Sequence, residues 1–171
     1  MASKDYNPTP HVIPEGQNAT PLEVVGGDVT STEKLIIIMT GLPATGKTHI
    51  ANRISRYLNF FLDLETKIFN VGDYRRSLFG SNLPAEFFDH TNKEYMAKRE
   101  EACDMALKEL IEFMSKDGVR VGLLDSTNAK KQRRDHIRET LEVLKCKIIT
   151  IETICDNKEV CVHAVPFLLL L

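Results

Sequence analysis

A short glycine-containing stretch, residues 41–48, constrains the fold more than any other part of the 171-residue chain. It reads Gly-Leu-Pro-Ala-Thr-Gly-Lys-Thr and fits the pattern G-x-x-x-x-G-K-T. An apolar run at residues 35–39 precedes it, and a segment with helical spacing at residues 49–58 follows it. A strand, a glycine loop and a helix in this order favour phosphate binding, because the loop N–H groups and the helix N-terminus point at one place.

The residues of this stretch divide into backbone and side-chain roles. Gly41 and Gly46 allow the backbone to curl so that successive N–H groups face phosphate oxygens. Lys47, which we expect to be exposed, is predicted to reach the terminal phosphates, and Thr48 is predicted to ligate Mg²⁺. The alternative is a strand-to-helix turn that binds no ligand.

Length and composition are those of one globular domain. The chain is 43% hydrophobic and 27% charged, which is ordinary for a soluble protein. Its formal net charge of −2 gives no overall attraction to nucleic acid or to an anionic membrane, so anion binding must be local. No apolar run follows Lys4 and Asp5 at the N-terminus, so we expect no secretory signal. We also expect a reducing, cytoplasmic location, because no metal-ligand spacing or C-x-x-C pair joins the four cysteines: Cys103, Cys146, Cys155 and Cys161.

Three regions of the chain differ in their residue pattern. Residues 1–33 contain prolines and a Gly-Gly pair without any period, and we expect a disordered leader there. Residues 34–159 carry strand and helix patterns and are expected to form one domain. Residues 160–171 are an apolar tail without amphipathic period, too short to span a bilayer.

Hydrophobic spacing predicts an alternation of strands and helices. The strands are expected at residues 35–39, 67–71, 119–125 and 147–154, and the helices at residues 49–58, 92–116 and 130–145. Residues 72–76 are predicted to leave the sheet in a loop. The order predicts an α/β fold with an open parallel sheet, right-handed crossovers and helices on both faces. Ligands of such sheets bind at the carboxyl ends of the strands.

Asp125 closes one of the predicted strands. Enzymes with this type of phosphate loop place a second acidic residue at such a position, near Mg²⁺. The alternative is a cap of the following helix, because Asp-Ser-Thr-Asn is also good capping chemistry. We favour the metal site, since the phosphate loop requires a carboxylate at a neighbouring strand end.

Basic residues also gather near the predicted strand ends. Arg75 follows the second strand, Arg99 lies on the inner stripe of the long helix, and Arg133 lies near the start of the next helix. A solvated basic face is the alternative, but a guanidinium among apolar residues, as at Arg99, needs an anion or an exit to solvent. We therefore expect a second, phosphorylated substrate. No aromatic residues interleave with these arginines, so we expect no single-stranded nucleic acid.

Short motifs along residues 35–159 resemble one enzyme family in order and in nearly all spacings. They are Gly-Leu-Pro-Ala-x-Gly-Lys-Thr at 41–48, Arg-Tyr-Leu-Asn at 56–59, Phe-Asn-Val-Gly-x-Tyr-Arg-Arg at 69–76, Phe-Phe at 87–88, Asp-x-Thr-Asn at 125–128, Arg-Arg-Asp at 133–135 and Glu-x-Ile-Cys-Asp at 152–156. These motifs look like the kinase half of the 6-phosphofructo-2-kinase/fructose-2,6-bisphosphatase family. The resemblance implies a P-loop kinase-like fold that is incomplete at its C-terminal end.

The resemblance also implies transfer of the γ-phosphate of ATP to the 2-hydroxyl of fructose 6-phosphate, giving fructose 2,6-bisphosphate, with Mg²⁺ as cofactor. The residues that match the family's nucleotide site are Gly41, Leu42, Pro43, Ala44, Thr45, Gly46, Lys47, Thr48 and His49. Those that match its sugar-phosphate site are Arg75, Arg99, Thr127 and Arg133. Thr48 and Asp125 match its metal site, and Lys47, Asp125 and Cys155 match its active centre. For Cys155, a small residue that closes a strand is an equal alternative.

The chain also departs from the family pattern. Thr45, His49 and Ser126 stand where many members have Arg, Tyr and Ala, which is expected to weaken phosphate contacts. After Glu159 the likeness ends, and no bisphosphatase motif is present, so we expect impaired activity. Two alternatives are another small-molecule P-loop kinase and a truncated, non-catalytic isoform that binds ATP weakly. We also expect the chain to form a homodimer or to associate with full-length subunits.

Overall fold

A computed structural model describes residues 33–89 and 91–155 of the chain. The chain divides into two compact units, Met1–Ser31 and Thr32–Leu171, and all described residues belong to the second. The predicted leader, except its last residue, and the predicted apolar tail lie outside the described residues. None of the helices in the described ranges combines the length and the apolar character that crossing a membrane requires.

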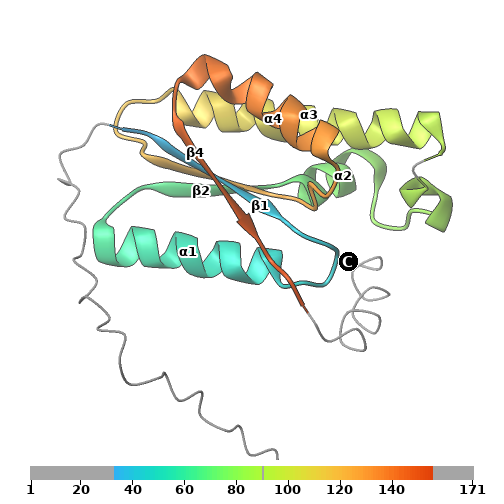
Figure 1. Cartoon of the computed structure of the whole chain (residues 1–171), viewed down its shortest axis with the longest axis horizontal. Coiled ribbons are helices and arrows are strands. Elements are labelled where there is room, and N and C mark those ends of the chain that lie inside the picture. Colours follow the sequence, from blue (N-terminus) through green and yellow to red (C-terminus); the bar gives the residue numbers. More distant parts are fainter. Residues whose placement is uncertain (1–32, 90, 156–171) are drawn as a thin grey trace, which may run out of the picture. The chain divides into compact units, whose positions relative to one another are not determined.

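At least one helix joins each strand to the next along the described part of the second unit (Figure 1). The strands are β1 (Leu35–Thr40), β2 (Thr66–Asn70), β3 (Val121–Asp125) and β4 (Lys147–Glu152). The α-helices are α1 (Lys47–Leu62), α2 (Val71–Phe79), α3 (Lys93–Met114) and α4 (Lys131–Leu141), and two 3₁₀ turns are η1 (Ala85–Phe88) and η2 (Glu142–Leu144).

The four strands form one parallel sheet in the order β2-β3-β1-β4. Leu35 of β1 pairs with Val121 of β3 on one side and with Lys147 of β4 on the other. Side chains of β1 alternate between the two faces, and both faces are covered, which explains why its run is apolar without a period of two. The predicted open parallel sheet is confirmed, and its strands end at the edge where ligands of such folds bind.

Helices cover both faces of this sheet, as predicted. Figure 1 shows α1 on one side and α3 and α4 on the other. Ile37 and Met39 of β1 pack with Ala51 of α1, whereas Ile36 and Ile38 pack with residues of α3 and α4. Burying one such side chain contributes roughly 1.5–3 kcal/mol, so these two cores hold the strand ends in fixed places.

The prediction of a loop at residues 72–76 is wrong, because these residues belong to α2. The side chain of Asn70 accepts a hydrogen bond from the backbone N–H of Gly72 at 2.8 Å and caps the helix. Tyr74 donates a hydrogen bond to Glu109 of α3 at 2.8 Å, which ties the helix to the long helix beside it. These contacts stabilise a helix that contains Gly72, a residue of low helix propensity.

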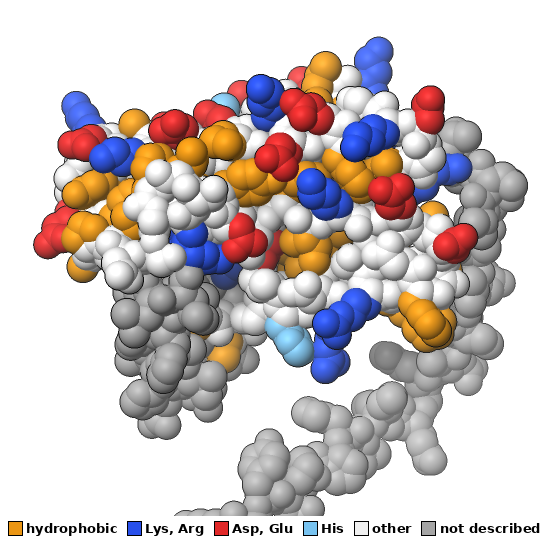
Figure 2. Space-filling view, turned by 180° about the vertical axis from the view of Figure 1, so that it is seen from behind, with side chains coloured by type: hydrophobic (Ala, Val, Ile, Leu, Met, Phe, Trp, Pro, Cys, Tyr) orange, Lys and Arg blue, Asp and Glu red, His pale blue; other side chains and the backbone are white. Residues whose placement is uncertain are grey.

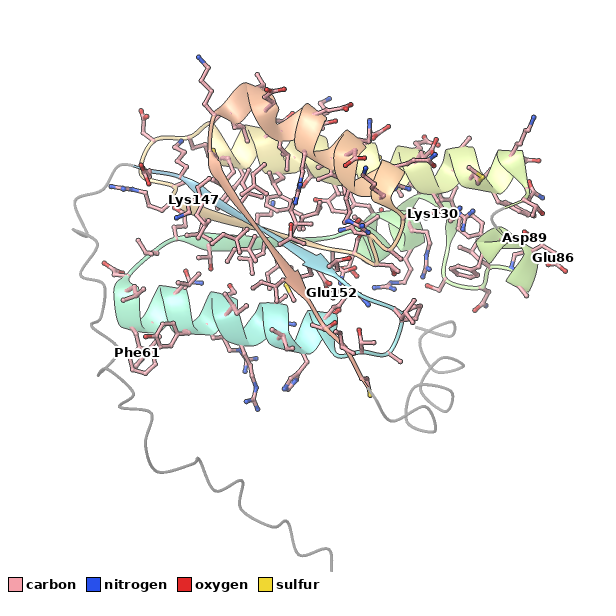
Figure 3. All side chains as sticks on the ribbon, in the orientation of Figure 1. Phe61, Glu86, Asp89, Lys130, Lys147 and Glu152 are labelled. Atoms are coloured by element: carbon pink, nitrogen blue, oxygen red, sulfur yellow. The ribbon has the colours of Figure 1, made fainter. Side chains whose placement is uncertain are left out.

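The other predicted elements differ from the structure only at their ends. α1 continues to Leu62 and stops at Asp63, whose backbone is left-handed (φ 50°) and whose N–H bonds to the carbonyl of Leu58. The predicted helix at 130–145 ends as an α-helix at Leu141 and continues as the 3₁₀ turn η2. β4 runs from Lys147 to Glu152, the two ends labelled in Figure 3, and so ends before residue 154.

The surface of the described residues is mixed in charge. Figure 2 shows Lys and Arg side chains interspersed with Asp and Glu over the described part of one face, consistent with the net charge of −2. One exposed aromatic cluster lies on α1, where Tyr57 is 55%, Phe60 82% and Phe61 67% exposed. Phe61 lies at the C-terminal end of α1 and points away from the sheet (Figure 3).

Candidate functional site

The loop between β1 and α1 curls around its glycines. Gly41 (φ 139°), Ala44 (φ 66°) and Gly46 (φ 84°) all have positive φ, a conformation that favours glycine. Gly41 is buried, and its N–H donates to the carbonyl of Thr127 at 3.0 Å. A Cβ on Gly41 would lie 2.5 Å from the carbonyl oxygen of Thr153, so this position has no room for a side chain. The loop therefore has the compact shape that the glycine pattern predicts.

Thr153, just beyond β4, supports this loop from the side. Its N–H donates to the carbonyl of Thr40 at 2.9 Å, and its Oγ1 lies 2.7 Å from Oγ1 of Thr45. Thr45 in turn donates to the carbonyl of Leu42 at 2.8 Å. The loop is thus connected to the end of β4 as well as to the end of β3. Sequence reasoning missed Thr153, and only its place directly after a strand could have indicated it.

Lys47 lies at the base of the loop and is 9% exposed, so the expectation that it is exposed is wrong. Its Nζ donates to the carbonyl of Leu42 at 2.5 Å. Burial lowers the pKa of Lys47, and the nearby carboxylate of Asp125 acts in the opposite direction. A partly desolvated ammonium beside the loop N–H groups is a favourable environment for phosphate oxygens.

Asp125, at the end of β3, is 2% exposed and lies at the centre of a polar cluster. Thr48 of α1 donates its hydroxyl to Oδ2 of Asp125 at 2.6 Å, and Asn70 donates its side-chain N–H to the same oxygen at 2.8 Å. Burial raises the pKa of Asp125, while these two hydrogen bonds and the charge of Lys47 oppose the rise. Sequence reasoning named Thr48 and Asp125 but assigned no role to Asn70, although Asn70 lies in the motif at 69–76 and asparagine is a preferred N-cap residue.

The alternative role of Asp125 as a helix cap does not fit the structure. α4 begins at Lys131 with Lys130 as its N-cap, and no side-chain capping bond is present there among the described residues. The hydroxyl of Thr48 and the carboxylate of Asp125 are hard oxygen donors in direct contact. Such a pair of oxygen donors would suit Mg²⁺, which prefers oxygen ligands.

Three arginines from three helices are linked through Phe88 and Arg99. Arg99 of α3 donates from Nη1 to the carbonyl of Phe88 at 3.1 Å and from Nη2 to the carbonyl of Asp89 at 3.0 Å. The guanidinium of Arg75, on α2, lies 5.2 Å from the centre of the Phe88 ring. Arg133 of α4 donates from Nη2 to the carbonyl of Arg99 at 3.4 Å. The fold therefore brings together arginines that are far apart in the sequence.

These arginines are partly desolvated. Burial lowers the pKa of Arg99, and the charge of Arg133 lowers it further. Burial also lowers the pKa of Arg75, with a second contribution from Arg76. Nε of Arg75 and Nη1 of Arg133 are buried and hydrogen-bond to no side chain or backbone group of the described residues. A buried donor without a partner costs about 1–3 kcal/mol, so this cluster favours an anionic ligand.

The remaining predicted site residues lie at the same edge of the sheet or beside it. Leu42 is 65% exposed at the tip of the loop, and His49 is exposed in the first turn of α1. Thr127 is exposed after β3, and its carbonyl accepts the hydrogen bond from Gly41. Cys155 is partly buried beyond β4. The contributions of these side chains to binding or catalysis stay predictions.

Sequence comparison relates this chain to one enzyme family. The family model described as 6-phosphofructo-2-kinase matches residues 25–166. The 6-phosphofructo-2-kinase/fructose-2,6-bisphosphatase of Arabidopsis thaliana is 41% identical over 126 residues, which are 74% of this chain and 16% of that protein. The 6-phosphofructo-2-kinase/fructose-2,6-bisphosphatase 3 of Homo sapiens is 34% identical over 134 residues, 78% of this chain and 26% of that protein. The chain thus spans well under a third of the length of these relatives.

Solved structures with a similar fold include P-loop kinases. The Mycobacterium tuberculosis APS kinase CysC, in complex with AMPPNP and APS, superposes with a TM-score of 0.58 at 18% identity, over 78% of this chain and 69% of that chain. The crystal structure of APE1195 has a TM-score of 0.53 at 23% identity, over 80% and 72%. These likenesses confirm the P-loop kinase-like α/β fold. Together with the family match over residues 25–166, they lead to one conclusion: the chain belongs to the 6-phosphofructo-2-kinase family.

Proposed function

We propose that this chain binds Mg·ATP at the loop after β1 and fructose 6-phosphate at the cluster of Arg75, Arg99 and Arg133. It transfers the γ-phosphoryl group to the 2-hydroxyl of the sugar and forms fructose 2,6-bisphosphate. Membership of the family supports the kinase reaction, and the geometry of the site supports the two binding regions. Cytoplasmic location, self-association and binding to full-length subunits stay predictions from the sequence.

The residues of the chain supply positioning and charge in this reaction. The N–H groups of the loop and the ammonium of Lys47 hold the phosphates of the nucleotide, next to the N-terminus of α1. Thr48 and Asp125 would hold Mg²⁺, which supplies positive charge to the phosphate oxygens when it is bound. The raised pKa of Asp125 also suits a group that accepts the proton of the sugar hydroxyl. Holding both substrates in line is the main source of rate in phosphoryl transfer.

One observation carries the assignment of the second substrate: within residues 33–89 and 91–155, buried side-chain nitrogens of Arg75 and Arg133 have no hydrogen-bond partner. Phosphate oxygens are acceptors for donors of this kind, and each charge-assisted hydrogen bond contributes about 1.5–3 kcal/mol. Arg99 is already bonded to the carbonyls of Phe88 and Asp89, so it fixes the cluster and adds charge to it. A phosphate beside this cluster is held from three helices, α2, α3 and α4.

Calorimetry on the purified chain tests the proposal directly. We expect fructose 6-phosphate to bind in the presence of Mg·AMPPNP, and fructose without a phosphate to bind at least tenfold more weakly. Arg133→Ala should lose this preference for the phosphorylated sugar. Arg138→Ala is the matched control, because Arg138 also lies on α4 but is exposed and bonds to Thr150 at 3.4 Å. Equal affinities for the sugar and its phosphate would overturn the proposal, and an assay for fructose 2,6-bisphosphate tests the transfer itself.

A further inference from the structure

Asn70, the last residue of β2, uses both ends of its side-chain amide. Nδ2 donates to Oδ2 of Asp125 at 2.8 Å, across to the end of the neighbouring strand β3. Oδ1 accepts from the backbone N–H of Gly72 at 2.8 Å and caps α2. Asn70 and Asp125 are direct partners in the parallel pairing of β2 with β3, so the sheet itself sets the separation of these two side chains.

The chemistry of the two contacts fixes the orientation of the amide. The carboxylate of Asp125 can only accept in its ionised form, and the N–H of Gly72 can only donate. Turning the amide over would place its oxygen against the carboxylate and its NH₂ against the N–H of Gly72, and both contacts would be lost. Ionised aspartate at position 70 has no donor for Asp125, and serine is too short to make both contacts. Among these polar side chains, only asparagine offers a donor and an acceptor at this length.

The two ends of the amide serve different halves of the site. Asp125 also accepts from Thr48 at 2.6 Å, at the start of the nucleotide helix α1. α2 carries Arg75, which belongs to the arginine cluster proposed to bind the sugar phosphate. A single side chain therefore connects the carboxylate beside the nucleotide loop with the first turn of the helix that bears a sugar-phosphate ligand.

We propose that Asn70 is a positioning residue that holds the Asp125 carboxylate for Mg²⁺-dependent nucleotide binding and, through the cap of α2, holds Arg75 for the phosphorylated sugar. This inference rests on the proposed function. The inference adds to the proposed function the residue that sets the geometry between the two binding regions. Asn70 itself contacts Asp125 and Gly72, and acts through them.

Two substitutions separate the two contacts. Asn70→Ser keeps a good N-cap acceptor for α2 but no longer reaches Asp125, whereas Asn70→Ala loses both contacts. The matched control is Asn59→Ala. Asn59, on α1, also uses both ends of its amide: it accepts from the N–H of Thr66 at 3.2 Å and donates to the carbonyl of Ser55 at 2.8 Å. Thr66 is the first residue of β2, so these contacts lie at the opposite end of that strand from Asn70.

Calorimetry with AMPPNP, with and without Mg²⁺, gives the deciding measurement. We expect both Asn70 variants to lose at least tenfold in the gain of affinity that Mg²⁺ provides, while metal-free AMPPNP binds within twofold of wild type because Lys47 and the loop are intact. In the presence of Mg·AMPPNP, Asn70→Ala should bind fructose 6-phosphate at least fivefold more weakly than Asn70→Ser. In Asn59→Ala, the gain in AMPPNP affinity from Mg²⁺ and the affinity for fructose 6-phosphate should both stay within twofold of wild type.

The outcomes distinguish this inference from the proposed function. If the gain from Mg²⁺ is the same in wild type, Asn70→Ser and Asn59→Ala, Asn70 has a structural role only and the inference is overturned. If wild type binds Mg·AMPPNP but not fructose 6-phosphate, the proposed function fails, while the link from Asn70 to Asp125 is still tested by the metal dependence. Urea unfolding of all three variants shows whether a loss of affinity reflects a loss of folding.

Discussion

Replacing Gly41 by alanine tests the shape of the phosphate loop. The new Cβ would lie 2.5 Å from the carbonyl oxygen and 2.8 Å from Oγ1 of Thr153, and φ at this residue is +139°. Backbone strain of this kind costs about 1–3 kcal/mol. Overpacking against a backbone atom costs about 1–3 kcal/mol more, because Thr153 cannot move away without breaking its bond to Thr40. We therefore expect Gly41→Ala to lower the free energy of unfolding by about 2–6 kcal/mol.

Gly46→Ala is the internal control for this experiment. Gly46 also has positive φ (+84°), but a Cβ there would meet no described atom within 4 Å. Only the conformational strain applies, about 1–2 kcal/mol. Urea unfolding followed by circular dichroism, without ligand, measures both variants against wild type. Equal losses in the two variants would refute the reasoning, because the contact with Thr153 would then contribute nothing.

Three other changes test the site. Lys47→Ala should abolish Mg·ATP binding in calorimetry. Its melting temperature should be unchanged or higher than that of wild type, because the mutation removes a buried ammonium that is partly desolvated. A loss of stability as large as the loss of binding free energy would contradict this prediction. Arg75→Ala should weaken fructose 6-phosphate binding by about 10- to 100-fold and change ATP affinity only a few-fold, as titration of both ligands would show. Asp125→Asn should raise the stability of the ligand-free protein at neutral pH. Burial raises the pKa of this carboxyl above its ordinary 3.8, so the folded wild type loses stability as the pH rises from 3.8 through the raised pKa. Asparagine does not ionise and avoids this loss. Thermal unfolding from pH 4 to 8 should therefore show that the extra stability of Asp125→Asn over wild type disappears at the acid end.

Much of the fold follows from local patterns in the sequence. The apolar run before Gly41 and the helical spacing after Lys47 predict β1 and α1, and the alternation of elements predicts the parallel sheet. The helix α2 was not predicted, because Gly72 has low helix propensity and the local cap from Asn70 was not recognised. The packing of Tyr74 against α3 is likewise a tertiary effect.

The candidate site was predictable where a residue type is chemically required. Lys47, Thr48 and Asp125 follow from the needs of a phosphate and a metal ion. The support residues Asn70 and Thr153 were missed, because their roles depend on which strands are neighbours, and hydrophobic spacing does not give the order β2-β3-β1-β4. The burial of Lys47 was missed for a similar reason: it results from the curl of the loop over its own lysine.

The place of β1 in the sheet also sets when the loop can form during synthesis. β1 leaves the ribosome before its sheet partners, yet it pairs with β3 and β4 and not with β2, which follows it in the chain. The contacts that support Gly41 and Thr45 come from Thr127 and Thr153, far downstream. Such long-range pairing gives a high contact order and slow folding. The nascent chain must therefore carry an unpaired, apolar β1 until β3 and β4 emerge, which is the period when chaperones or aggregation compete for it.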